Sequence, residues 1–187
     1  MSGADTPVLT IATVQSSDQG NYDCIVSNIC GSVLSATVDL SCRPIVTAQP
    51  PPSSILAPGL RLTIGVPTGA SYTYRWRQNG QNLFNFPGFF AGVTTRSLAI
   101  LSADPSLAGS YDCVLTSSCG STGSTIADVF CPADFNRSFS VDPDDLADYI
   151  GTYFADLPGT GSDFNQDGLT DPDDLADFIT AFFTGCG

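Results

Sequence analysis

The strongest constraint on the fold is a pattern that occurs twice, 89 residues apart. In the first copy Leu9 is followed by Tyr22, Cys24 and Cys30, and the second copy begins at Leu98 with its tyrosine and cysteines at the same spacing. A repeat of this length corresponds to one β-sandwich domain. The chain has 187 residues and is therefore long enough for one such domain with a real core and part of a second.

The first 131 residues are patterned as β-strands. Residues 8–14 and 60–66 alternate apolar residues with small or polar ones, and Gly, Ser, Asn and Pro separate such runs. This alternation predicts strands with one buried face. The first copy of the 89-residue repeat has room for only about three strands before Cys42. We therefore expect a mainly β fold with a partial unit at 1–42 and a complete sandwich at 43–130.

Both copies resemble the immunoglobulin-like superfamily. Residues 18–24 read Asp-Gln-Gly-Asn-Tyr-Asp-Cys, which is similar to the signature before strand F of that fold. The tyrosine two residues before the cysteine resembles the tyrosine corner. The resemblance implies that Trp76 is the core tryptophan of strand C. Ile64 stands where this family usually has its strand B cysteine.

Seven cysteines and no histidine favour disulfides over zinc, and hence a secreted or cell-surface protein. Because Ile64 replaces the usual partner in strand B, we expect pairs within the hairpins, with free buried thiols as the alternative. We also expect a disulfide that joins the two ends of the last module. For Cys42 we expect either an intermolecular partner or one in a segment outside this sequence. The expected pairs are Cys24–Cys30, Cys113–Cys119 and Cys131–Cys186.

A second repeat, with an offset of 29 residues, lies in the acidic last third of the chain. Residues 134–145 and 163–174 each place oxygen-bearing groups at positions 1, 3, 5, 7, 9 and 12, the ligand spacing of a calcium loop. Gly168 holds position 6 of the second loop, where the turn needs positive φ, but Phe139 holds it in the first. We therefore expect weaker binding, or none, in the first loop. The expected Ca²⁺ ligands are Asp163, Asn165, Asp167, the carbonyl of Leu169, Asp171 and Asp174, and in the first loop Asp134, Asn136, Ser138, the carbonyl of Ser140, Asp142 and Asp145.

Residues 131–187 resemble the dockerin type I module, in which two calcium loops are each followed by a helix and aspartate is common at position 12. This resemblance implies an EF-hand-like α-helical module that docks onto a cohesin-like protein. It also implies partner contacts at loop positions 10 and 11, which are Pro143, Asp144, Pro172 and Asp173. Immunoglobulin-like units followed by such a terminal repeat are similar to secreted proteins of planctomycete-type bacteria.

Charge and composition exclude several function classes. The net charge is −13, so no basic surface exists to bind nucleic acid. No apolar run is long enough to insert into a membrane. The chain has no His, Lys or Glu, which rules out Ser-His and Cys-His pairs, so we expect no enzyme activity.

The sequence therefore predicts a non-catalytic, extracellular, calcium-binding adhesion or docking protein, with an Ig-like spacer that attaches to a cell-surface or cohesin-like partner. One alternative is a filament subunit that self-associates by strand completion of residues 1–42. Another is the C-terminal appendage of a secreted hydrolase. The first five residues do not resemble a signal peptide, so we expect either a longer secreted protein or an export signal not visible in this sequence.

Overall fold

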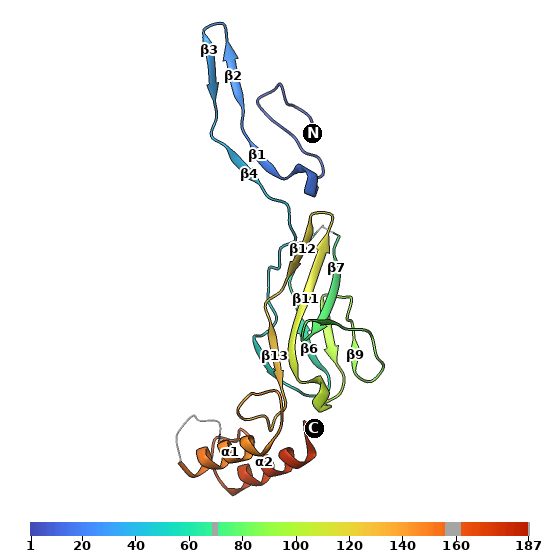
Figure 1. The fold of residues 1–187 in the computed structure, drawn as a ribbon, viewed down its shortest axis with the longest axis vertical. Helices are drawn as coiled ribbons and strands as arrows, with labels where there is room; N and C mark the ends of the chain where they lie inside the picture. Colours follow the sequence, from blue (N-terminus) through green and yellow to red (C-terminus); the bar gives the residue numbers. More distant parts are fainter. Residues whose placement is uncertain (69–70, 156–161, 187) are drawn as a thin grey trace.

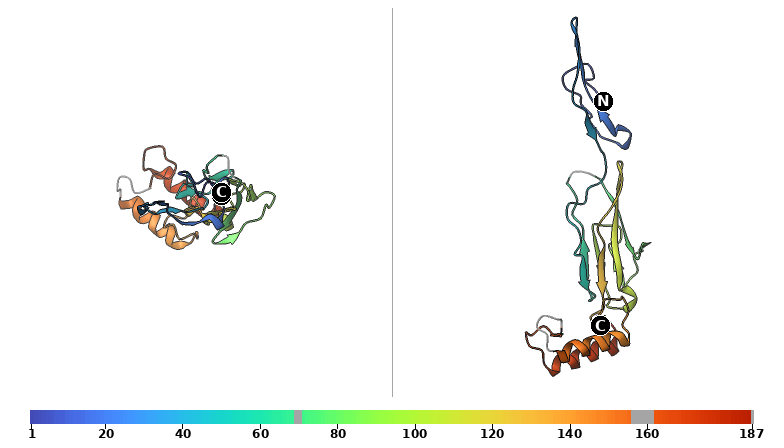
Figure 2. Two further views of the ribbon diagram at one scale, coloured as in Figure 1. Left: turned by 90° about the horizontal axis from the view of Figure 1, so that it is seen from above. Right: turned by 60° about the vertical axis from the view of Figure 1, so that its left-hand side comes forward.

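The computed structural model describes residues 1–68, 71–155 and 162–186. The chain is elongated, with a small N-terminal β unit, a central sandwich and a pair of helices placed one after another along its length (Figures 1 and 2). Among the described residues, neither helix has the length and apolar character needed to cross a bilayer.

The central sandwich consists of two sheets that enclose the main core. The larger sheet has the strand order β5-β13-β11-β7-β8, with β12 also paired to β11, and the smaller has the order β6-β10-β9. Most neighbouring strands are antiparallel, but β5 runs parallel to β13. The strands are β5 (Ser53–Ile55), β6 (Leu60–Thr63), β7 (Thr73–Gln78), β8 (Gln81–Asn82), β9 (Phe90–Ala91), β10 (Ser97–Ile100), β11 (Gly109–Ser117), β12 (Gly120–Gly123) and β13 (Ala127–Phe130).

Trp76 lies at the centre of this core, fully buried and paired in register with Cys113 on β11. Ile64 is buried in the same cluster. The phenol of Tyr111 is also buried and donates a hydrogen bond of 2.6 Å to the carbonyl of Leu107, which ends the short 3-10 helix η2 (Pro105–Leu107). This contact is a tyrosine corner, and together with the buried tryptophan it makes the sandwich immunoglobulin-like.

The N-terminal unit repeats the local structure of the second half of the sandwich. Tyr22 donates to the carbonyl of Asp18 at 2.7 Å, the equivalent of the Tyr111 contact. The amide of Cys24 donates to Ser35, as that of Cys113 does to Ser124. The elements are η1 (Ser16–Asp18), β1 (Gly20–Tyr22), β2 (Ile25–Asn28), β3 (Gly31–Leu34) and β4 (Val38–Leu40), with β1 paired to β4 and β2 to β3.

The strand expected at residues 8–14 is not formed. Only Thr10 makes a β-bridge, to Ser2. The equivalent segment of the sandwich, β10, pairs with β6 along its whole length, and residues 1–42 contain no equivalent of β6. The alternating pattern is present, but the neighbouring strand that would supply the hydrogen bonds is not.

The expected disulfides within the two hairpins are wrong. Cys119 pairs with Cys42, at a Cα–Cα distance of 5.2 Å, and this bond links the end of the N-terminal unit to the tip of the sandwich. Because Ser117 and Gly120 are the last paired residues of the β11–β12 hairpin, Cys119 lies in its turn. Cys113 lies four residues before Ser117, about 13 Å along an extended strand, and so out of reach of the turn.

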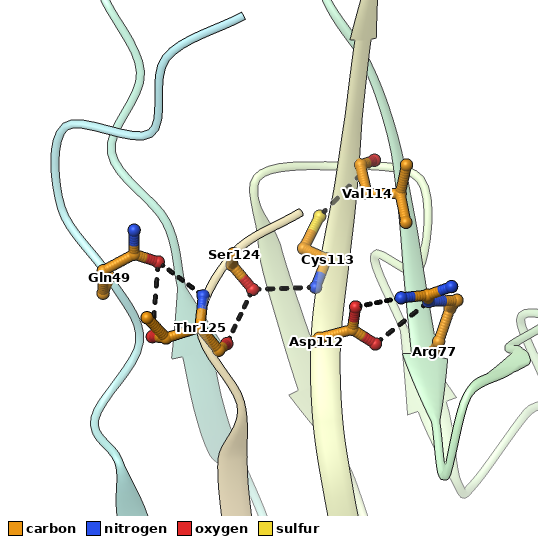
Figure 3. A network of polar contacts seen from close by, with 7 residues as sticks. All are labelled: Gln49, Arg77, Asp112, Cys113, Val114, Ser124 and Thr125. Carbon is orange, nitrogen blue, oxygen red and sulfur yellow. Dashed lines mark hydrogen bonds and ion pairs between the residues drawn. The ribbon is translucent and has the colours of Figure 1, made fainter. Parts of the chain in front are cut away.

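The same geometry keeps Cys24 from pairing with Cys30 in the equivalent hairpin, and both are free and exposed. Cys113 is free but fully buried. Figure 3 shows it between the ion pair of Asp112 with Arg77 and the hydrogen bond from its own amide to Ser124. The third expected pair is the one that the structure contains, since Cys131 is bonded to Cys186.

Candidate metal centre

The C-terminal module is built around two helices, α1 (Pro143–Ala155) and α2 (Pro172–Thr184), which lie side by side (Figures 1 and 2). Tyr149 and Phe178 occupy equivalent positions of the 29-residue repeat. Both are fully buried, and their rings stack with centroids 3.9 Å apart. Phe135 and Phe164, also equivalent, each contact this pair edge-on. The core of the module is therefore symmetric about its central aromatic pair.

The second candidate loop is folded by its own carboxylates. Asp163, at position 1, accepts hydrogen bonds of 3.1 and 3.0 Å from the main-chain N–H groups of Asp167 and Gly168. Asp174, at position 12, is buried and accepts from the amides of Asn165 and Asp171 at 3.1 and 2.8 Å. The two acidic ends of the loop thus turn inward and hold the backbone around them.

The first loop has the same arrangement. Asp134 is buried and accepts from the amides of Ser138 and Phe139 at 2.8 and 2.9 Å. Asp145, also buried, accepts from the amides of Asn136 and Asp142 at 3.0 and 2.9 Å. Ser138 contacts the side chain of Ser140, which in turn donates to Asp142. Hydrogen bonds therefore connect the expected ligand residues of the first loop to one another.

Phe139 adopts the turn conformation that suits glycine. Its φ is +68°, close to the +94° of Gly168 at the same position of the second loop. Such a φ is strained for a bulky side chain. The Phe139 ring stacks on Phe130 at a centroid distance of 4.7 Å, and the Arg137 guanidinium lies over the Phe130 ring. These contacts offset the backbone strain, so the first loop keeps its shape.

One carboxylate in each loop, at non-equivalent positions, has a shifted pKa. Burial raises the pKa of Asp134 above its ordinary value, because a desolvated carboxylate favours its neutral form. The main-chain N–H of Asp171 lowers the pKa of Asp174, because a hydrogen bond to the carboxylate stabilises its charge. The first loop also has Ser138 where the second has Asp167 and so carries one fewer carboxylate.

The donor set fits a hard cation such as Ca²⁺, which prefers carboxylate, amide and carbonyl oxygens. Each carboxylate that accepts two N–H bonds keeps further lone pairs for an ion. Within the described ranges, however, no three His, Cys, Asp or Glu side chains are already gathered into a metal-binding group. A bound ion would therefore have to draw the loop carboxylates closer together.

The expected partner-contact residues lie in the first turn of each helix, where all four are exposed: Pro143, Asp144, Pro172 and Asp173. Phe154 and Phe183 each continue a series of apolar residues at helical spacing, but their side chains are 74% and 77% exposed. They occupy equivalent positions of the repeat, so the module shows a symmetric pair of exposed aromatic rings. The 3.6-residue period shows which face of a helix is apolar. It does not show how much of that face the neighbouring helix covers.

Comparison with known proteins gives partial matches. No family model matches the chain. It is 33% identical to hemicentin-2 of Mus musculus over 122 residues and 34% identical to roundabout homolog 2 of Homo sapiens over 134 residues. These matches cover 63% and 65% of this chain but only 2% and 9% of the two relatives. The chain thus spans a small part of the length of either protein.

Among solved structures, the chain is similar to extracellular domains 3–5 of Drosophila OTK, with 21% identity over 62% of this chain and 41% of that one, and a TM-score of 0.39. It is also similar to the tandem Ig repeats of Dlar, with 19% identity over 60% of this chain and 61% of that one, and a TM-score of 0.42. These scores are low, so the fold assignment rests on the strand order, the buried tryptophan and the tyrosine corner. On those grounds the chain is mainly β, with an immunoglobulin-like sandwich followed by two helices.

Proposed function

We propose that this chain is a non-catalytic extracellular adhesion or docking protein, in which Ig-like units act as a spacer and a dockerin-like module binds Ca²⁺ and a partner protein. The observation that carries this proposal is the shared folding of the two acidic loops, with buried carboxylates of Asp134, Asp145 and Asp174 turned toward the loop backbone. The disulfides Cys42–Cys119 and Cys131–Cys186 are consistent with an oxidising, extracellular location.

Calcium would stabilise the module by relieving repulsion among the carboxylates. Asp163, Asn165, Asp167, Asp171 and Asp174 would supply side-chain oxygens of the second loop, and Leu169 its carbonyl. Because the ion binds only the folded loop, its free energy of binding adds to the stability of the module. The first loop has Ser138 at the position of Asp167 and therefore one fewer carboxylate, so it would bind the ion more weakly.

The partner surface would lie over the exposed first turns of the helices and the exposed rings of Phe154 and Phe183. Exposed aromatic side chains are common at the centres of protein interfaces. A cohesin-like or cell-surface protein is the kind of partner proposed. The filament and the hydrolase appendage stay as predictions from the sequence.

Calcium titration with a charge-matched control tests the proposal. Asp167→Ala removes a proposed ligand, whereas Asp177→Ala removes an exposed aspartate of α2 outside the loop. Calcium at about 100 times its dissociation constant should stabilise the module by about 2.7 kcal/mol. Isothermal titration calorimetry and thermal unfolding should show at least tenfold weaker binding for Asp167→Ala and little change for Asp177→Ala. If chelation leaves the unfolding of residues 131–187 unchanged, the calcium proposal is wrong.

A further inference from the structure

The N-terminal unit contains an open apolar groove that the proposed docking function does not use. Its volume is about 490 Å³. The same unit leaves Val26 67% exposed, although the equivalent Leu115 of the sandwich is fully buried. The lining of the groove includes Ala4, Thr6, Leu9, Tyr22, Cys24 and Val38.

The sandwich shows what fills the equivalent space. Trp76 on β7 lies opposite Cys113 in register. Its main-chain N–H donates to the carbonyl of Val93 at 3.0 Å, and its indole Nε1 donates to the carbonyl of Thr95 at 2.9 Å. On the facing sheet, Leu62 lies opposite Leu98. In the sandwich, β7 with its tryptophan thus occupies the place next to β11, and the apolar strand β6 occupies the place next to β10.

All of these contact positions recur in the groove. With the 89-residue offset, the three partners of Trp76 correspond to Cys24, Ala4 and Thr6, and Leu98 corresponds to Leu9; all four line the groove.

The local geometry is also the same. Thr6 Oγ1 donates to the carbonyl of Gly3 at 2.9 Å, as Thr95 Oγ1 donates to that of Gly92 at 3.0 Å. The turn that contains the Thr6 carbonyl therefore has the same local hydrogen bond as the turn that contains the Thr95 carbonyl.

We propose that this groove binds an Ig-type β segment supplied from outside residues 1–187, with the strand pattern of residues 43–89 and a tryptophan whose indole N–H donates to the Thr6 carbonyl. The occupant is not a second copy of this chain. In each copy Trp76 is fully buried in its own sandwich, and extracting it would expose that core to water. The segment would add strands to an open sheet and cover apolar side chains, the usual mode of strand addition.

The thiol of Cys24 reports occupancy of the groove, because it lines the groove and is exposed, whereas its equivalent Cys113 is buried and lies beside Trp76 on the neighbouring strand. The full chain is labelled with a maleimide in the presence of a synthetic segment of residues 43–89, which contains no cysteine. We expect saturating segment to slow labelling of Cys24 at least tenfold. Cys30 lies outside the groove lining and should react at an unchanged rate.

Two controls distinguish specific docking of the segment from nonspecific binding. A segment with Trp76→Ala should protect Cys24 at least tenfold less well, and Leu9→Asp in the full chain should abolish protection. If the isolated segment aggregates, the same residues fused before Met1 provide the test within one chain. The proposal is overturned if Cys24 reacts equally fast in every case, or if both segments protect equally. Protection that rises with protein concentration without any segment, together with dimers in sedimentation, would instead assign the groove to a second copy.

Discussion

The N-terminal unit and the second half of the sandwich have the same local structure but opposite environments. Both contain the short 3-10 helix, the tyrosine hydrogen bond and the hairpin with a cysteine in its turn. Cys113 is fully buried, whereas Cys24 is exposed. The difference arises because β5, β6 and β7 cover only the sandwich. Local hydrogen bonds can therefore set the shape of a β unit without giving it a core.

Truncation of equivalent apolar residues should give the largest difference between the two units, measured as a change in the free energy of unfolding. Leu115→Ala removes a fully buried side chain and should reduce the free energy of unfolding by about 2–5 kcal/mol. Val26→Ala removes one that water already reaches and should change it by less than about 0.5 kcal/mol. Hydrogen exchange measured by mass spectrometry resolves the two units. Equal losses of protection around both sites would contradict the comparison.

Thiol chemistry should give the next largest contrast. Burial raises the pKa of Cys113 from 9.0 to about 11, so below pH 9 its reactive thiolate is about 100-fold less populated than at the ordinary value. Maleimide should therefore label the exposed Cys24 at least 100 times faster near neutral pH, and labelling of Cys113 should rise as the pH approaches 11. In urea the two should react alike. Fast labelling of Cys113 in the folded chain would show that the sandwich core is open.

The smallest contrast should come from the two tyrosine corners. Tyr111→Phe leaves the carbonyl of Leu107 without its buried donor and should cost about 1–2 kcal/mol. Tyr22→Phe removes an equivalent bond in a half-exposed site, where water replaces the lost donor, and should cost less than about 0.5 kcal/mol. Hydrogen exchange of β11 and β1 measures both. A larger effect at Tyr22 would mean that the N-terminal unit is better covered than the structure shows.

Much of the fold could be predicted from residues that interact with near neighbours. The Asn79-Gly80 turn, the tyrosine corners and the two helices beginning at Pro143 and Pro172 all depend on contacts within a few residues. The acidic loops belong to the same group, since the Asp163 carboxylate bonds to amides four and five residues ahead. Whether those loops hold Ca²⁺ stays a prediction.

The cysteine pairing could not be predicted in the same way. Cys42 and Cys119 are 77 residues apart in sequence, and only the meeting of the two units brings them together. Cys113 and Cys119 are close in sequence, but an extended strand holds them apart. Proximity along a chain is a poor guide to proximity in space when the intervening residues form a strand.

The sequence by itself determined the repeated local units: hairpins, corners, loops and helix starts, because their hydrogen bonds join residues a few positions apart. Only the tertiary structure decided which cysteines meet and which apolar faces are covered. Those outcomes depend on strands far away along the chain, and residues 1–42 keep an open face because no such strand of the described residues packs against it.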